Sequence, residues 1–280
     1  MMPKPTDSTF LDQVSKDEDG FAFGATPKLT TTLKRLVRAY PKDIGIIKEF
    51  IQNADDAGAK YVKIIMDWRH HPASLLPDPK MQVLMGPALL IFNDAVFSDE
   101  DLASIQNIGE SIKQIDTSKI GRFGLGFNAT YNVTDYPSLL TRQYVLFFDP
   151  HLNVIPGADY QKPGRGWDLK EKYKGKKAWE IYPDMLTPFG ILDSRFTTNQ
   201  DYFDGTLFRL PLRTENNFQE SLIKQEAFTN ADFTFILDQL KHLGAELLLF
   251  LKNVSEITVS EIKPDSNSLD LLLSIKTVNE

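Results

Sequence analysis

The run of nine residues from position 49 to position 57, Glu-Phe-Ile-Gln-Asn-Ala-Asp-Asp-Ala, constrains this chain more than any other segment. A helix turns by about 100° per residue, so Glu49, Asn53 and Asp56 would fall within roughly 60° of one another. The opposite side would carry apolar residues at helical spacing: Ile44, Ile47, Ile51 and Ala54. We therefore predict one amphipathic helix, from about residue 43 to residue 57, that buries one face and presents polar groups on the other.

The polar face of this predicted helix carries three groups with distinct chemistry. A carboxylate such as that of Glu49 can orient a water molecule or take its proton. The amide oxygen of Asn53 is a hard ligand that suits magnesium. Asp56, one turn further on, can accept hydrogen bonds from either group or from a ligand. The alternative is an ordinary solvated face, which is what most polar helix faces are.

A second motif, Ile-Gly-Arg-Phe-Gly-Leu-Gly-Phe at residues 120 to 127, is rich in glycine. Glycine adopts positive φ and lets backbone N–H groups approach an anion closely. The residues from Phe127 to Asn132 read as helical, so the loop would lie at a helix N-terminus, where phosphate is favoured. It lacks the Lys-Ser/Thr ending of a P-loop and the flanking strand and acidic residue of a dinucleotide fold. Taken alone, it is equally compatible with a structural loop.

Elsewhere the hydrophobic pattern predicts a mixture of helices and strands. Helices are expected over residues 29–40, 98–108 and 233–251. Strands are expected over residues 61–67, 88–92, 144–148, 206–210, 257–262 and 269–278. Residues 151–179, rich in Gly, Pro and Lys, are expected to form an exposed excursion. Because strands and helices mix without βαβ regularity, the pattern favours an α+β sandwich with helices on one face of a mixed, mostly antiparallel sheet.

In this order, the two motifs resemble the ATP site of the GHKL superfamily. The family's first box, E-x-x-x-N-x-x-D-A, is matched by Glu49, Asn53, Asp56 and Ala57. Its glycine box, G-x-F-G-x-G-F, is matched by Gly121, Phe123, Gly124, Gly126 and Phe127, with Leu125 at the variable position. A third match is the segment from Asp204 to Phe208, which contains the Gly-Thr pair that the family places on a strand beside the adenine.

The resemblance is closer still to the sacsin-type branch and covers roughly Phe23 to Ser260. The stretches that carry it include Gln-Asn-Ala-Asp-Asp-Ala-Gly-Ala at 52–59, Asn-Asp-Ala-Val-Phe at 93–97, and Phe-Asp-Pro-His at 148–151. They also include Gly-Thr-Leu-Phe-Arg-Leu-Pro-Leu-Arg at 205–213 and Leu-Phe-Leu-Lys-Asn-Val at 249–254. This resemblance implies a Bergerat-type fold of the α+β class.

The resemblance also implies a role for each matched residue. Glu49 would position or deprotonate the attacking water, and Asn53 would hold magnesium. Adenine would be fixed, directly or through water, by Asp56, by Asn93 or Asp94, and by Thr206. Backbone N–H groups of the glycine box would cradle the phosphates: Gly121, Phe123, Gly124, Leu125, Gly126 and Phe127. Residues 109–119 would form a lid, from which Lys113 could reach the γ-phosphate.

One segment departs from the family pattern. Most members place an Asp-x-Gly-x-Gly turn after the second core strand, whereas residues 93–97 here read Asn-Asp-Ala-Val-Phe, without glycines. Counting from the strand puts Asn93 at the Asp position, and a shift of one residue would put Asp94 there. An Asn oxygen also accepts hydrogen bonds, so adenine recognition would survive either choice. The alternative is that Asn93 and Asp94 are ordinary turn formers.

Bulk properties limit the function classes. The chain has 280 residues, a formal net charge of −7 and no cysteine, which excludes disulfides and thiolate zinc sites. An acidic chain is not built to coat nucleic acid or an anionic membrane. No apolar stretch approaches eighteen residues, so we expect a cytoplasmic protein. The pair His70-His71 has no ligand partners at metal spacing and is expected on the surface.

The sequence therefore predicts a flexible tail over residues 1–22 and a single ATP-binding domain over residues 23–280, as a module of a larger protein. Its expected ligands are ATP or ADP with Mg²⁺. Its expected function is slow ATP hydrolysis in a chaperone-like conformational switch, with unknown client proteins. The alternative is a module that binds nucleotides or proteins without turnover. The oligomeric state is not determined by the sequence.

Overall fold

The computed structural model describes residues 16–17, 20–21, 28–39, 43–106, 125–190 and 201–277. Its strands are β1 (Lys16–Asp17), β2 (Gly20–Phe21), β3 (Tyr61–Asp67), β4 (Ala88–Asn93), β5 (Ser138–Arg142), β6 (Tyr144–Phe148), β7 (Gly164–Asp168), β8 (Lys172–Tyr173), β9 (Lys176–Lys177), β10 (Phe203–Pro211), β11 (Glu256–Ile262) and β12 (Asp270–Lys276). An eight-stranded sheet has the order β12-β11-β3-β4-β10-β5-β6-β7. Its neighbouring strands pair antiparallel except β3 and β11, which are parallel. The predicted mixed, mostly antiparallel sheet is therefore confirmed.

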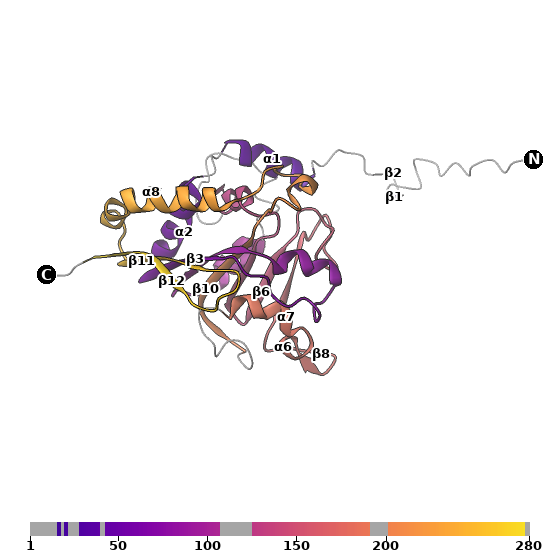
Figure 1. Cartoon of the computed structure of the whole chain (residues 1–280). Helices are drawn as coiled ribbons and strands as arrows, with labels where there is room; N and C mark the ends of the chain where they lie inside the picture. Colours follow the sequence, from indigo (N-terminus) through magenta and orange to yellow (C-terminus); the bar gives the residue numbers. More distant parts are fainter. Residues whose placement is uncertain are drawn as a thin grey trace, which may run out of the picture.

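The long helices lie on one face of this sheet (Figure 1). They are α1 (Leu29–Ala39), α2 (Gly45–Asp56) and α8 (Asn230–Leu249). The shorter α3 (Asp99–Gln106), α5 (Leu125–Asn128) and η3 (Ala129–Asn132) add side chains to the same apolar cluster. The core positions predicted for this helix are all buried: Ile44 at the N-cap of α2, and Ile47, Ile51 and Ala54 within it. The α2 helix thus has the orientation that its sequence pattern predicts.

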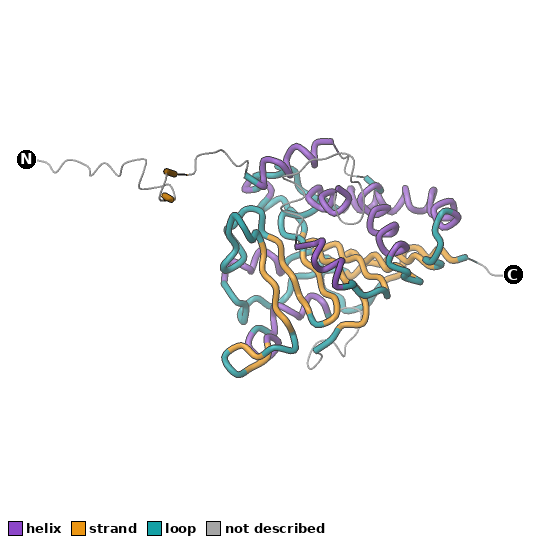
Figure 2. Tube along the Cα trace, turned by 180° about the vertical axis from the view of Figure 1, so that it is seen from behind, coloured by secondary structure: helices purple, strands orange, loops and turns teal. Residues whose placement is uncertain are grey.

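The opposite face is covered by short elements and loops, visible from behind in Figure 2. These are η2 (Pro79–Met85), α6 (Ala178–Ile181), α7 (Pro183–Leu186) and η4 (Thr187–Phe189). They form a second apolar cluster that includes Leu84, Met185 and Phe189. The predicted arrangement, with helices on one face of the sheet, therefore applies to the long helices only. Within the described ranges, none of the helices combines the length and apolar character that crossing a membrane requires.

The expectation of an exposed excursion over residues 151–179 is wrong in part. Strand β7 in this segment completes the edge of the main sheet, and Trp167 is only 3% exposed. The glycines that read as loop signals serve close packing instead. A Cβ on Gly164 would lie 2.6 Å from the Phe147 carbonyl oxygen, and one on Gly166 would lie 2.5 Å from Leu146 Cδ2.

The other predicted elements agree closely with the structure. A capping box begins α3, since Ser98 N donates to Asp101 Oδ2 (2.9 Å) and Asp101 N donates to Ser98 Oγ (3.1 Å). The terminal hairpin is β11 paired with β12. Strand β5 was not predicted. The predicted tail, residues 1–22, falls almost entirely outside the described residues, as does the whole predicted lid over residues 109–119.

A buried carboxylate fixes the C-terminal end of α2. Asp55 is 6% exposed and accepts hydrogen bonds from the backbone N–H groups of Lys252 (3.0 Å), Asn253 (2.6 Å) and Val254 (2.8 Å). Burial alone would raise the pKa of Asp55, but these backbone hydrogen bonds outweigh it and lower the pKa. Asp55 therefore ties α2 to the loop that leads into β11.

A second buried carboxylate lies at the end of β3. Asp67 accepts hydrogen bonds from Arg69 Nε (2.8 Å) and His71 Nε2 (3.0 Å). The surface expectation was therefore wrong for His71, whose side chain is 6% exposed, although His70 is exposed. Burial opposes ionisation of Asp67, yet the hydrogen bonds from His71 and Arg69 outweigh it and lower its pKa to about 2.

Replacing Asp55 by Ala should lower the free energy of unfolding by about 3 kcal/mol, because three backbone N–H groups lose a charged acceptor. Gln52→Ala, at an exposed position of the same helix, should change it by no more than about 0.5 kcal/mol. Denaturant unfolding of both variants measures the difference. Equal losses in the two variants would show that Asp55 does not anchor α2.

Asp67 should make the free energy of unfolding decrease as the pH falls. Its pKa is lower in the folded chain than the ordinary value of about 3.9, so its stabilisation is complete above about pH 4 and is lost as the pH falls toward 2. Asp67→Asn should therefore be about 2 kcal/mol less stable at pH 7, with a deficit that shrinks between pH 4 and pH 2. Unfolding curves across this range, with the exposed Asp265→Asn as control, measure it. A deficit independent of pH would contradict the assignment.

Candidate functional site

Four phenylalanines from distant parts of the chain meet in one buried cluster. The ring centroid of Phe208, on β10, lies 4.9 Å from that of Phe50, 6.1 Å from that of Phe97 and 6.0 Å from that of Phe127. Each of these partners belongs to one of the matched sequence segments: Phe50 to the α2 box, Phe97 to the turn after β4, and Phe127 to the glycine box. The cluster therefore brings together segments that are up to about 160 residues apart in sequence.

The polar flank of α2 faces the β10 side of the sheet. Asp55 lies about 200° around the helix from Asn53 and is bonded to the loop before β11. In the sheet, β11 lies on one side of β3 and β4, and β10 lies on the other. Glu49 and Asn53, which are both partly buried, are therefore directed toward β10 and α5, while Asp56 is exposed. Partial burial raises the pKa of Glu49.

A row of polar side chains crosses three neighbouring strands below this flank. Asn93 on β4 is the register partner of Thr206 on β10, and Thr206 is the register partner of Thr141 on β5. All three are buried, with exposed fractions of 7%, 1% and 0%. Each lies two residues from a member of the apolar cluster under the long helices, and thus on the same face: Ile91, Phe208 and Leu139.

This polar row closes the turn that follows β4. Asn93 Oδ1 accepts a hydrogen bond from Ala95 N (3.0 Å), and Thr206 Oγ1 donates to Ala95 O (2.7 Å). Thr141 Oγ1 donates to Gly205 O (2.8 Å) and accepts from the N–H of Phe97 (3.3 Å). The turn over residues 93–97 is therefore built without glycines by side chains of neighbouring strands.

The backbone conformation and close packing at Gly205 explain why β10 contains a Gly-Thr pair. Its φ is +143°, which disfavours residues with a side chain. A Cβ at this position would also lie 2.6 Å from the Phe92 ring and 2.8 Å from Asn93 O. The glycine permits close approach of β10 to the end of β4, and the threonine then bonds to the turn.

The structure separates the two alternatives for the position after β4. Asp94 Oδ1 accepts hydrogen bonds from Lys60 N (2.7 Å) and Tyr61 N (3.2 Å), where the chain begins β3. Asn93 instead shares the helix-bearing face with Thr206. Asn93, and not Asp94, therefore lies beside Thr206 on the sheet face that carries the long helices. Which of the two residues contacts adenine stays a prediction.

The glycine box is only partly described. Gly121, Phe123, Gly124 and Lys113 lie outside the described residues. Leu125 and Gly126 begin α5, so the predicted helix after the box is present as α5 followed by η3. The side chain of Phe127 is 2% exposed and belongs to the core, which leaves only its backbone for a ligand. Among the described residues, no group of three or more His, Asp or Glu side chains could hold a metal ion. Asn53 as a magnesium ligand stays a prediction.

Thr141 is the member of the polar row that the sequence analysis missed. It was missed because β5 was not recognised, although Ser-Leu-Leu-Thr at 138–141 places Leu139 and Thr141 on one face of a strand. Arg209 and Arg213, which follow Thr206 on and beyond β10, serve the fold. Arg209 donates to the carbonyls of Leu84 and Gly86, with 2.8 Å to the latter.

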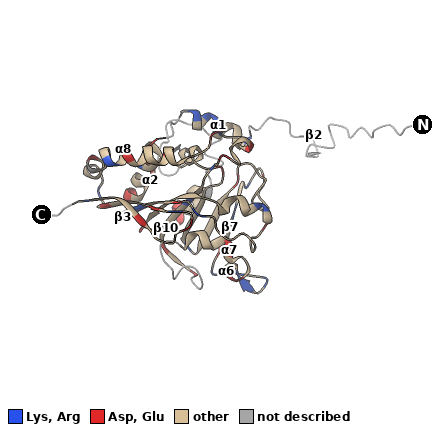
Figure 3. Ribbon diagram, in the orientation of Figure 1, with Lys and Arg blue, Asp and Glu red and all other residues tan. Residues whose placement is uncertain are grey.

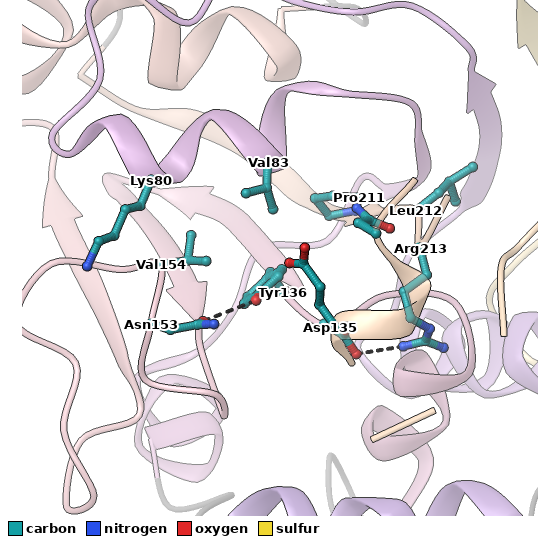
Figure 4. Close-up of a pocket in the computed structure, with 11 residues that line it drawn as sticks. Lys80, Val83, Asp135, Tyr136, Asn153, Val154, Pro211, Leu212 and Arg213 are labelled. Carbon is teal, nitrogen blue, oxygen red and sulfur yellow. Dashed lines mark hydrogen bonds and ion pairs between the residues drawn. The ribbon is translucent and has the colours of Figure 1, made fainter. Parts of the chain in front are cut away.

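A cavity of about 350 Å³ lies at the other end of β10 (Figure 4). The strand rises by about 3.3 Å per residue, so Arg213 is roughly 20 Å from Thr206. The Arg213 guanidinium pairs with Asp135 (2.8 Å), and Tyr136 Oη donates to Asn153 Oδ1 (3.1 Å). None of the predicted site residues that the structure describes lines this cavity. Because its buried charges satisfy each other, we assign it no ligand.

The basic segment at residues 172–177 forms the β8–β9 hairpin. It lies beyond α6, on the side of the sheet away from α2 (Figure 3). The Lys177 ammonium bonds to Asp201 (2.9 Å). The hairpin is thus separate from the candidate site.

Known proteins resemble this chain along most of its length. The model of the sacsin domain family matches residues 26–274. Human sacsin is 35% identical over 259 residues, which cover 92% of this chain and 5% of sacsin. Protein NO VEIN of Arabidopsis thaliana is 23% identical over 216 residues, which cover 68% of this chain and 7% of that protein. The crystal structure of an N-terminal domain of a DNA repair protein aligns with a TM-score of 0.40 and 11% identity, over 87% of this chain and 55% of that chain.

The chain thus spans only a small fraction of the length of these two relatives. Both the family match and the alignment with human sacsin extend over the α2 box, the turn after β4 and the Gly-Thr strand. The chain belongs to the sacsin domain family.

Proposed function

We propose that this domain binds ATP with Mg²⁺ between the polar flank of α2 and the polar row Asn93–Thr206–Thr141, and hydrolyses it slowly. The observation that carries this proposal is the Phe208 cluster, which collects the α2 box, the turn after β4, the start of α5 and the Gly-Thr strand around one residue. Four segments matched to a nucleotide site in sequence order thereby become neighbours in space. An accidental match would leave them scattered over the fold.

In the proposed complex each group acts on a different part of the nucleotide. Asn53 supplies an amide oxygen to magnesium, whose other ligands would be phosphate oxygens and water. Glu49 lies one turn before Asn53 on the same flank, where its carboxylate can take a proton from the attacking water. Asn93 and Thr206 face the base, with Asp56 at the exposed end of the flank. The glycine box would supply backbone N–H groups to the phosphates.

The raised pKa of Glu49 supports its proposed role as general base and predicts how the rate of hydrolysis depends on pH. A general base must be ionised, and burial keeps the Glu49 carboxyl protonated to higher pH than an exposed glutamate. Hydrolysis should therefore decline, as the pH falls, at a higher pH than for an ordinary carboxylate.

In a longer protein, the proposed cycle would serve as a conformational switch, in the manner of chaperone ATPases, acting on client proteins. A second candidate function is nucleotide binding without turnover. It is favoured by one observation, the engagement of the Asn93 oxygen by Ala95 N, which weakens base recognition relative to a carboxylate with two oxygens.

The chain should bind ATP in a magnesium-dependent way. Calorimetric titration with ATP and ADP, each with Mg²⁺ and with EDTA, should show binding that weakens at least tenfold when the metal is removed. No heat and no thermal shift at millimolar Mg–ATP would refute the proposed function.

Two substitutions on α2 should separate binding from chemistry. Glu49→Gln should bind Mg–ATP within about threefold of the parent and lose at least about 100-fold in hydrolysis rate, since a general base acts on water. Asn53→Ala should instead weaken binding of Mg–ATP by about tenfold or more. Exposed Gln52→Ala, between them on the helix, should change neither. Turnover at the parental rate in Glu49→Gln would show that Glu49 is not the general base. Binding of Mg–ATP with no turnover in the parent itself would favour the second candidate function.

A further inference from the structure

We propose that Asn93 opens this site to purines that carry an oxygen at position 6, so that guanine and hypoxanthine nucleotides bind at least as tightly as ATP. The inference rests on the proposed function, because it specifies the base of the bound nucleotide. It concerns neither the phosphates nor hydrolysis.

The hydrogen bond from Ala95 fixes the orientation of the Asn93 amide. A backbone N–H can only donate, so the Asn93 atom 3.0 Å from Ala95 N is the oxygen Oδ1. This partner removes the usual ambiguity between the oxygen and nitrogen of an amide. The group of Asn93 that remains for a ligand is therefore the NH₂, and no hydrogen bond within the described residues uses it.

The hydroxyls of Thr206 and Thr141 already donate their protons to backbone carbonyl oxygens. Thr206 Oγ1 donates to Ala95 O at 2.7 Å, and Thr141 Oγ1 donates to Gly205 O at 2.8 Å. The two hydroxyl oxygens lie 3.3 Å from each other. With both protons directed to carbonyl oxygens, Thr206 can offer a ligand only a lone pair. Side by side in register, the row presents a donor at Asn93 and an acceptor at Thr206.

This pattern complements the edge of a 6-oxopurine. Guanine and hypoxanthine carry an acceptor, O6, beside a donor, the N1–H, whereas adenine carries a donor, the 6-amino group, beside an acceptor, N1. A 6-amino group placed at Asn93 would set a donor against a donor. Because Asn93 is 7% exposed, leaving its NH₂ without an acceptor also has a cost. An aspartate there would keep one oxygen for Ala95 N and offer the second to the amino group.

The test is a set of calorimetric titrations of the whole chain with the Mg²⁺ complexes of ATP, ITP, GTP and UTP. ITP differs from ATP only at positions 6 and 1, and UTP reports binding through the triphosphate alone. The parent should bind ITP and GTP at least as tightly as ATP, and more tightly than UTP. Asn93→Asp, which exchanges the NH₂ for an oxygen, should shift the ratio of ATP to ITP affinity by about tenfold or more toward ATP. Asn153→Asp makes the same change of charge at the distant cavity and should leave the ratio as in the parent.

The outcomes of these titrations distinguish failure of this inference from failure of the proposed function on which it rests. Failure of every triphosphate to bind refutes both. Tighter binding of ATP than of ITP by the parent refutes the inference and leaves ATP binding standing. Equal binding of UTP, or an Asn93→Asp ratio unchanged from the parent in a variant that circular dichroism shows to be folded, also refutes it. Should Asn93→Asp not fold, the parental ratio of ITP to ATP decides alone.

Discussion

The contacts of Phe208 with Phe50, Phe97 and Phe127 are the constraint on which the rest of this architecture depends. They lie on the helix-bearing face of the central strand β10 and hold α2, the turn after β4 and α5 against one another. Aromatic contacts in a buried core combine a large apolar area with preferred ring geometries, so they fix positions as well as stabilise the fold. The polar groups carried by these segments inherit their placement from this apolar cluster.

Polar side chains on an otherwise apolar sheet face must be bonded, and here the bonding shapes the site. Asn93, Thr206 and Thr141 hold the turn after β4 and leave a defined pattern of unused donors and acceptors. The opposite flank of α2 is held by Asp55, which prevents the helix from rotating and so keeps Glu49 and Asn53 directed toward β10. The contacts that bury these side chains and stabilise the fold are therefore the same contacts that orient the polar groups of the proposed ligand site.

Much of this could be predicted from the sequence, for identifiable reasons. The α2 helix was predictable because its polar and apolar residues follow one helical period, and β11 with β12 because their alternation is regular. Strand β7 was not, because Gly164 and Gly166 signal a loop until their close packing on β6 is seen. The pairing of His71 with Asp67 joins residues whose local pattern shows no shared face.

At the candidate site, the sequence could not predict which way the hydrogen bonds run. Through resemblance, the sequence indicated Asn93 or Asp94, together with Thr206, as base contacts, and it allowed the Asn93 oxygen to face adenine. Only the structure places Ala95 N on that oxygen and the Thr206 proton on Ala95 O. Thr141, which completes the row, required the register of β5 against β10, which a single sequence does not provide.

The most direct test of the account is amide hydrogen exchange of the chain with and without Mg–nucleotide. If the Phe208 cluster gathers one site, nucleotide should slow exchange together at residues 54–57, 93–97 and 125–128, three segments that are distant in sequence. Exchange around residues 135–136 and 211–213, at the far cavity, should remain unchanged. Protection confined to the far cavity, or to only one of the three segments, would contradict a single nucleotide site built on Phe208.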